Sequence, residues 1–443
     1  MFQGTLLAVF GALAVAGVLI FAFAVGGSNK TALGAVSIWG TLDSNAFATV
    51  LRQAADDNPS LNQVTYVQKD LTTYEADLTN ALASGQGPDL FLMTQEYAAK
   101  DEAKIFPIPF STFSKSQFES TFADAANAFE GSGGIEALPI AIDPLVLYWN
   151  KDMISSGGFV QPPIYWDQLL GMAQKLSVKD DAGSLVKSTV AFGEFQNVTH
   201  AKDILATLIL QAGGEITFYD NAGHLQSALV PKLNNATQAT VNALRFFTQF
   251  ADPSKDYYSW NRSLPEARSS FASGKLALYV GYASEESEIA RMNPNLNYGI
   301  APMPQIRGSA NSLDSARVYG LAIPKASKNK NGASIVAYTL VNPTYAQPLS
   351  TALKMPPARR DLLDASAKSQ IPKELLSSTD ICKGGSIVIC SVKMARTWID
   401  PDPKETDAIF RVMIEDTTSG AALISEAVSR ADQQLSHLLN QQQ

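Results

Sequence analysis

Short apolar segments alternate with amphipathic segments over most of this chain, and this alternation constrains the fold more than any other feature of the sequence. Apolar runs of strand length cover residues 35–39, 64–67 and 90–93. Segments with helical periodicity, which we expect to form helices, cover residues 46–56, 74–83, 166–176, 203–212, 238–250 and 330–341. Because strands that alternate with helices over short connections favour a mainly parallel sheet, the sequence predicts an α/β fold.

Length and composition restrict the class of protein. With 443 residues, the chain is long enough for two or three domains, and its 46% of hydrophobic residues can bury a large core. Acidic residues outnumber basic ones by 42 to 34, the net charge is −8, and no dense basic stretch occurs, which argues against a nucleic-acid partner. Since His200, His224, His437, Cys382 and Cys390 do not have zinc-site spacings, we expect no metal and no organic cofactor.

The amino-terminal segment is almost free of polar groups. No charged side chain occurs before Lys30, and residues 5–26 would form an apolar helix of roughly 30 Å, which matches a bilayer core. Two interpretations stay open, an uncut transmembrane anchor and a secretory signal peptide cut after the Ala-Phe-Ala at residues 22–24. The missing basic start and the long apolar region favour the anchor. Residues 27–34 would then form a polar linker.

The two cysteines are a candidate disulfide. Cys382 and Cys390 flank a turn-like Lys-Gly-Gly-Ser segment, which could bring the two sulfur atoms together in a hairpin or tight loop. An oxidising compartment outside the cytoplasm would favour the bridge. The alternative is a pair of free buried thiols.

Aromatic and acidic residues follow the expected strands. Trp39 ends the first strand and Asp43 lies shortly after it, Glu96 follows the third strand, and Asp143 follows a strand near residue 140. Ligands of open α/β sheets bind outside the carboxyl ends of the strands. An aromatic face stacks on the C–H face of a sugar, and carboxylates accept hydrogen bonds from its hydroxyls, so the pattern predicts a neutral polyhydroxy ligand. The alternative for each aromatic is a packing role.

A series of sequence blocks between residues 35 and 439 carries a family resemblance. In chain order the blocks are VTYVQKDLTTYEADLTNALASGQGPDLFLM, LPIAIDPLVLYWNKDM, PPIYWDQLLGMAQKL, SFASGKLALYVGYASE, YGIAPMP, VYGLAIPKASKNKNGA, MPPARRDLL and ALISEAVSRADQQL. Together they resemble the extracellular solute-binding proteins of ABC importers, in particular the sugar-binding family to which maltose-binding proteins belong. None of the blocks is catalytic, and their specificity lies in their order and spacing.

The resemblance implies a two-lobed periplasmic-binding-protein fold, a monomer that closes around its ligand in the cleft between the lobes. The first lobe would comprise residues 35–140 and 319–348, and the second lobe residues 141–318 and 349–443. The resemblance further implies that the closed form delivers its sugar to the permease subunits of an ABC transporter. The body would be held at the outer face of the cytoplasmic membrane by the amino-terminal helix, or be secreted or periplasmic if that segment is cleaved.

The strand-end pattern and the resemblance together predict a ligand-binding set without catalytic residues. The set is Trp39, Asp43, Tyr74, Glu96, Asp143, Tyr148, Tyr282, Arg317, Tyr319 and Arg359. Tyr282 stands in the segment where the family carries a Gly-Pro-Trp, which leaves the identity of the sugar open. The alternative for the arginines is a structural role in ion pairs.

Two other functions remain possible on the sequence. The chain could be a membrane-anchored sensor or a binding protein for a non-sugar solute, which would keep the fold and change the role. A glycoside hydrolase would use carboxylates such as Asp43, Glu96 and Asp143 as acid and base. Because no G-x-S-x-G, H-E-x-x-H, P-loop or Rossmann glycine pattern occurs, we expect a binding protein and not an enzyme.

Overall fold

The computed structural model describes residues 33–230, 237–309, 312–368 and 386–442. The expected membrane segment at residues 5–26 lies outside the described residues, as do Cys382 and most of the linker. None of the helices in these described ranges is both long enough and apolar enough to cross a bilayer.

The strands are β1 (Val36–Gly40), β2 (Val64–Gln68), β3 (Leu90–Thr94), β4 (Glu130–Gly131), β5 (Gly134–Ile135), β6 (Ala137–Asn150), β7 (Val178–Lys179), β8 (Leu185–Val190), β9 (Thr217–Tyr219), β10 (Leu225–Ser227), β11 (Leu276–Tyr282), β12 (Tyr298–Ala301), β13 (Asp314–Ala322) and β14 (Ala395–Arg396).

The α-helices are α2 (Ser44–Asp57), α3 (Tyr74–Ala83), α4 (Ala98–Asp101), α5 (Lys115–Thr121), α6 (Lys151–Ser156), α7 (Gln168–Leu176), α8 (Ala201–Gln211), α9 (Thr237–Thr248), α10 (Ala267–Ala272), α11 (Glu286–Met292), α12 (Lys330–Leu340), α13 (Pro343–Leu353), α14 (Arg360–Lys368), α15 (Ile387–Met394), α16 (Pro403–Thr418) and α17 (Ile424–Gln442).

One sheet runs through the whole body in the order β2-β1-β3-β13-β6-β11-β8-β7, with β12 added to β6 and β14 to β13. β1 pairs in parallel with β2 and β3, and β8 with β11. However, β13 is antiparallel to β3 and β6, and β6 is antiparallel to β11 and β12. The expectation of a mainly parallel sheet was therefore wrong, because β6 and β13 enter the sheet without the strand–helix–strand alternation on which it rested.

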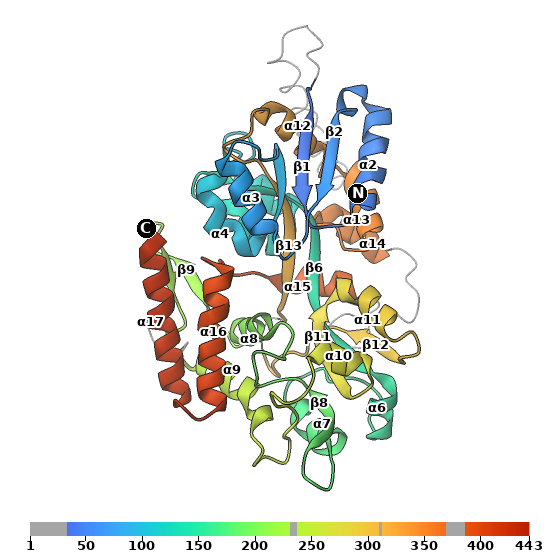
Figure 1. Ribbon diagram of the computed structural model, residues 1–443, viewed down its shortest axis with the longest axis vertical. Helices are drawn as coiled ribbons and strands as arrows, with labels where there is room; N and C mark the ends of the chain where they lie inside the picture. Colours follow the sequence, from blue (N-terminus) through green and yellow to red (C-terminus); the bar gives the residue numbers. More distant parts are fainter. Residues whose placement is uncertain (1–32, 231–236, 310–311, 369–385, 443) are drawn as a thin grey trace, which may run out of the picture.

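Two hydrophobic clusters divide the molecule into two lobes. The first lobe is built around the cluster that contains β1, β2 and β3, and the second lobe around the cluster that contains β8, β11, α8 and α16. β6 crosses from one to the other, with residues 137–142 in the first cluster and 145–148 in the second. In Figure 1, β6 and β13 run vertically between the upper first lobe and the lower second lobe.

The sequence of β6 explains its central position. ALPIAIDPLVLYWN is almost continuously apolar, and nearly every residue of the strand is buried. A strand that lacks polar alternation must be covered on both faces. β6 therefore forms the connection between the lobes and carries Asp143, its one charged residue, at the level where the two clusters meet.

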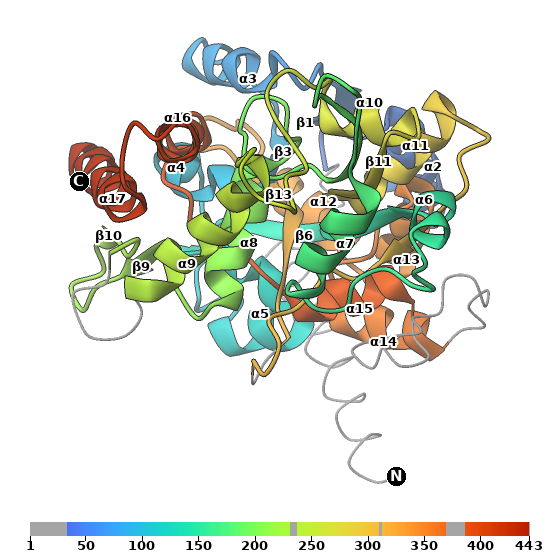
Figure 2. The same cartoon turned by 90° about the horizontal axis from the view of Figure 1, so that it is seen from below.

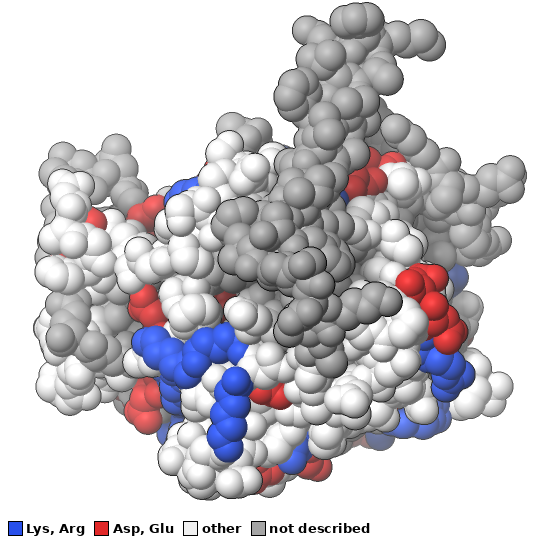
Figure 3. Space-filling view, turned by 90° about the horizontal axis from the view of Figure 1, so that it is seen from above, with Lys and Arg blue, Asp and Glu red and all other residues white. Residues whose placement is uncertain are grey.

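The carboxyl-terminal part of the chain contributes to both lobes. Leu349, Met355, Leu363 and Val392 belong to the first cluster, within the stretch 349–443 that the sequence boundaries assign to the second lobe. The long helices α16 and α17 pack on each other and on α9 at one side of the second lobe, as Figures 1 and 2 show. Seen from the end of the first lobe, acidic and basic side chains lie in small separate groups (Figure 3).

Candidate functional site

The candidate site is a cleft of about 320 Å³ to which both lobes contribute. It is lined by Glu96, Tyr97, Phe195, Val198, His200, Ala201, Lys202, Asp203, Arg317, Pro403 and Asp407. Because Glu96 and Tyr97 come from the first lobe and the start of α8 comes from the second, a ligand here would contact both lobes.

The elements around the cleft present their ends to it. Glu96 and Tyr97 belong to a 3-10 turn (Gln95–Tyr97) that follows β3 directly, as the strand-end rule expects. His200 is the N-cap residue of α8, and Pro403 and Asp407 lie in the first turns of α16. Two helix starts and one strand end therefore meet across the cleft.

Arg317 on β13 links the groups of both lobes. Its Nη2 lies 3.4 Å from Glu96 Oε1 in the first lobe, and its guanidinium carbon lies 4.3 Å from the ring centre of Tyr282 in the second. The hydroxyl of Tyr282 in turn donates to Asp203 Oδ2 at 3.0 Å. A guanidinium over an aromatic ring gains from the ring's quadrupole as well as from its carboxylate partner. The series of side-chain contacts Glu96–Arg317–Tyr282–Asp203 thus connects the two lobes at the cleft.

Lys202 links the start of α8 to the start of α16 at the cleft. It is only 8% exposed, and its Nζ lies 3.0 Å from Asp400 Oδ2 and 2.8 Å from Asp407 Oδ1. The same Nζ donates to the Pro403 carbonyl and to Thr406 Oγ1 at 3.2 Å each. Burial lowers the pKa of Lys202, but Asp400 and Asp407 raise it by more, so the amine stays charged.

His200 combines an unusual backbone with two acidic neighbours. Its φ of 62° and ψ of 30° lie in the left-handed region, which a residue with a Cβ seldom adopts. Its Nε2 lies 2.5 Å from Glu285 Oε1, and its Nδ1 lies 3.7 Å from Asp203 Oδ2. Strained backbone is often retained where a side chain must be held in a functional position.

Asp143 lies beside the cleft and inside the protein. It is 1% exposed and faces Arg317 across the β6–β13 pairing. Its carboxylate accepts from the Ser284 amide at 3.0 Å and from Ser284 Oγ at 2.6 Å. Burial raises the pKa of Asp143 to about 6, against the opposing effects of Ser284 and Arg317. Asp143 thus ties the segment after β11 to the strand that connects the lobes.

The cleft offers stacking surfaces and hydrogen-bonding groups. Tyr97 contributes an aromatic ring from the first lobe, and Phe195 contributes one from the second. The acidic and basic groups described above supply hydrogen-bond acceptors and donors. Among the described residues, no group of three or more His, Cys, Asp or Glu side chains is arranged to hold a metal ion. The arrangement suits a hydroxylated ligand with an apolar face.

The structure places four of the predicted ligand residues around Arg317 and the other five away from it; the four are Glu96, Asp143, Tyr282 and Tyr319. Glu96 and Arg317 line the cleft, and Tyr282 lies against Arg317. Asp43 is the exposed N-cap of α2, where its Oδ1 accepts from the Asn45 amide at 2.9 Å. The Asp43 carboxylate, a predicted ligand contact, thus caps a helix in this structure.

Trp39 and Tyr74 pack at the first cluster. The Tyr74 hydroxyl donates to the carbonyls of Trp39 and Leu92, at 3.1 and 2.8 Å, and so ties β1 to β3. The ring of Trp39 is covered by Lys69, whose Nζ lies 3.6 Å from its centre. Neither residue is among those that line the cleft.

Tyr148, Tyr319 and Arg359 also have structural partners. Tyr148 is fully buried, and its hydroxyl donates to the Tyr282 carbonyl at 2.8 Å. Tyr319, on β13, packs against the first cluster, and its side chain is also hydrogen-bonded to Arg317. Arg359 forms two hydrogen bonds with Asp361, at 3.0 and 2.9 Å, in agreement with the structural alternative for this arginine. Cys390 lies in α15 and Cys382 lies outside the described residues, so their pairing stays a prediction.

Sequence reasoning missed most of the residues that line the cleft. Tyr97 directly follows Glu96, so the strand-end rule could have included it. The others come mainly from the starts of α8 and α16, about two hundred residues apart in the chain. No local pattern marks their meeting.

Comparison with protein families gives one match over most of the chain. The family described as bacterial extracellular solute-binding protein matches residues 51–342. A protein of Brucella abortus (strain 2308) described as a binding protein is 23% identical over 265 residues. That alignment covers 58% of this chain and only 59% of the Brucella protein.

Two further relatives have names that state a ligand. A maltotriose-binding protein of Pyrococcus abyssi is 27% identical over 143 residues, which are 32% of this chain and 30% of that protein. The crystal structure of a cyclic α-maltosyl-1,6-maltose binding protein from Arthrobacter globiformis superposes with a TM-score of 0.72 at 16% identity. The superposition covers 92% of this chain and 99% of that one, so the two share a fold.

Proposed function

Because this chain belongs to the bacterial extracellular solute-binding proteins, we propose that it binds a neutral sugar or oligosaccharide in the interlobe cleft and delivers it to the permease of an ABC transporter. The observation that carries the proposal is the contribution of both lobes to one cleft, with Tyr97 on one side and Phe195 on the other. Closure of the lobes would bring these rings onto the two faces of a sugar.

The charged groups of the cleft would then form hydrogen bonds with the hydroxyl groups of the sugar. Glu96, Asp203 and Asp407 offer acceptors, and Arg317 and Lys202 offer donors. All of these groups already have partners in the protein, which keeps their side chains in place before a ligand arrives. Such preorganisation lowers the entropy cost of binding. The maltose-type ligands named for the Pyrococcus and Arthrobacter proteins are consistent with this class of ligand.

A thermal-shift panel tests the proposal. The purified chain is heated with mono- and oligosaccharides, amino acids and polyamines, and we expect only sugars to raise its Tm. A ligand at one hundred times its Kd stabilises the folded state by about 2.7 kcal/mol. Tyr97→Ala and Phe195→Ala should reduce the shift, whereas Phe106→Ala, at an exposed position outside the cleft, should not. A shift with amino acids or polyamines alone would refute the sugar assignment.

We further propose that residues 5–26 hold the protein at the outer face of the cytoplasmic membrane. Tethering would raise its effective concentration at the permease, roughly into the millimolar range. Mass spectrometry of the protein from membranes tests this localisation. An intact amino terminus is expected, and one that begins at Val25 would replace the tether by a cleaved, secreted or periplasmic form.

A further inference from the structure

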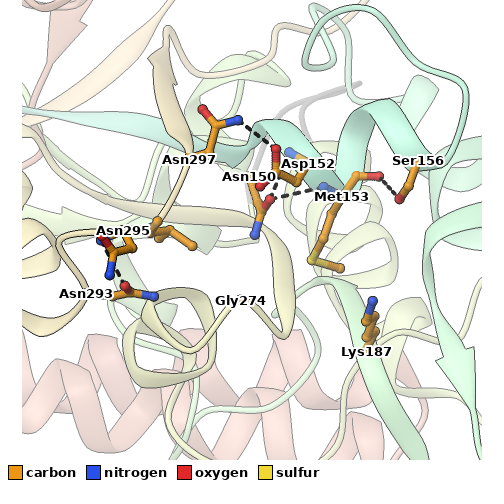
Figure 4. Close-up of a pocket in the computed structure, with 10 residues that line it drawn as sticks. Asn150, Asp152, Met153, Ser156, Lys187, Gly274, Asn293, Asn295 and Asn297 are labelled. Atoms are coloured by element: carbon orange, nitrogen blue, oxygen red, sulfur yellow. Dashed lines mark hydrogen bonds between the residues drawn. The ribbon is translucent and has the colours of Figure 1, made fainter.

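A second cavity, of about 390 Å³, lies on the second lobe and shares no residue with the cleft. Its lining includes Asn150, Asp152, Met153 and Lys187 together with three asparagines of the segment 293–297, and we call it the Asn-lined cavity (Figure 4). Nothing in the proposed sugar-binding function uses it.

The orientation of Asn150 turns its amide donor toward the cavity. The residue is 4% exposed, and its Oδ1 accepts from the amides of Asp152 and Met153, at 3.1 and 3.0 Å. These two donors require the oxygen on that side, so the amide nitrogen must face the other way, into the cavity (Figure 4). A Cβ placed on Gly274 would still lie 3.9 Å from Nδ2. Within the described ranges, this nitrogen has no hydrogen-bond partner.

Lys187, an exposed residue, supplies a positive charge from another element. It lies on β8, and its amine points toward the space beside Met153 (Figure 4). No carboxylate of the described residues forms an ion pair with it, and no acceptor among them takes its hydrogen bond. The nearest acid in the lining, Asp152, is instead held by Asn297, whose Nδ2 donates to its Oδ1 at 2.6 Å. The amine of Lys187 and the amide nitrogen of Asn150 therefore both lack a protein partner among the described residues.

These groups define a ligand class. An amide donor that faces the cavity and the ammonium of an exposed lysine without an ionic partner together favour an oxygen that carries negative charge. Met153 and Leu296 add apolar surface. The cavity volume of about 390 Å³ is far larger than the roughly 30 Å³ that one water molecule occupies, so the cavity has room for more than a small inorganic anion. We propose that the Asn-lined cavity binds a small organic carboxylate, whose oxygens accept from Asn150 Nδ2 and Lys187 Nζ and whose carbon skeleton packs on Met153 and Leu296.

Calorimetric titration of the full chain with lactate, malate, citrate and glucuronate tests the proposal. We expect at least one acid to bind and Lys187→Met to weaken it about tenfold or more, since it removes a charge-assisted hydrogen bond. Asn150→Asp, which retains an acceptor for the cap of α6 but no donor toward the ligand, should abolish binding. Lys179→Met, at the neighbouring strand β7 and outside the cavity, is the matched control and should leave binding unchanged.

Three results would overturn the proposal. The first is that no acid binds at millimolar concentration, and the second is that the affinity survives Lys187→Met. The third is that inorganic phosphate or a neutral sugar binds in the cavity while every organic acid fails. The proposal does not rest on the sugar-binding function. Arg317→Met, which alters the cleft, should leave the titration with the acid unchanged, so failure at one site is distinguishable from failure at the other.

Discussion

The interlobe cleft and the Asn-lined cavity are similar in size but differ in how their charged groups are satisfied. In the cleft, Arg317 pairs with Glu96, and Lys202 pairs with Asp400 and Asp407. In the cavity, Lys187 has no ionic partner among the described residues. A cleft ligand must fit into a network that the protein has already completed, whereas a cavity ligand would meet an exposed lysine without an ionic partner among the described residues. The first arrangement contributes to the stability of the empty protein, and the second does not.

The largest expected effect is on stability, from breaking the buried network of the cleft. Lys202→Met leaves Asp400, which is 1% exposed, without its cation, and should lower the free energy of unfolding by about 3–5 kcal/mol. Urea denaturation measures the loss. Lys255→Met removes an exposed lysine 4.0 Å from Asp252 and should cost less than about 1 kcal/mol. Equal losses in the two variants would contradict the distinction between buried and exposed pairs.

Asp143 should make the free energy of unfolding depend on pH. Its folded-state pKa of about 6 exceeds the usual 3.8, so the folded protein holds this proton to higher pH than the unfolded chain does. The contribution of Asp143 to stability is therefore greatest below about pH 4 and falls by up to about 3 kcal/mol as the pH rises through 6. Asp143→Asn should remove that fall. Parallel pH profiles of the unfolding free energy for wild type and variant would show that the carboxylate does not titrate in this range.

Arg317 tests whether the cleft and the cavity act separately. Arg317→Met removes donors and the cation over Tyr282, and should weaken the best sugar of the thermal-shift panel about tenfold or more. Calorimetry measures the change, with Arg307→Met as control, because Arg307 also lies over a tyrosine, Tyr165, but outside the cleft. An unchanged sugar affinity in Arg317→Met would place the sugar elsewhere.

The smallest effect is expected at the rim of the cavity. Asp152→Asn removes the one acidic side chain of the lining and should tighten binding of an organic acid by about threefold or less, because the charge is exposed and screened. The affinity at low and at high salt measures this. Weaker binding in the variant would mean that Asp152 helps the ligand, which points to a zwitterion.

The sequence patterns located the elements better than they located their partners. The expected strands at 35–39, 64–67 and 90–93 agree with β1, β2 and β3 within one residue at each end, and helices form at all the expected segments. Periodicity reports which face of a local segment is buried. The antiparallel course of β6 and β13 depends on contacts far apart in the chain, on which periodicity has no information.

The candidate site was predictable only in part, because sequence patterns carry no information on contacts between distant segments. Glu96 follows a strand end and lines the cleft, whereas the positions of Lys202 and Asp407 depend on the packing of α8 against α16. Tyr148 is fully buried, and because β6 is covered on both faces, its sequence pattern cannot separate core positions from ligand positions. Strand ends can be read from a sequence, but the meeting of two distant helix starts cannot.

The two strands that cross between the lobes also determine the order in which the chain can fold during synthesis. β1, β2 and β3 leave the ribosome early, but β13, which separates β3 from β6 in the sheet, follows about two hundred residues later. The first lobe therefore cannot complete its core until most of the second has been made. In the meantime, apolar residues such as Phe91 and Leu92 lack their final cover. A nascent chain of this design depends on slow, non-local pairing, and on protection from aggregation until that pairing is made.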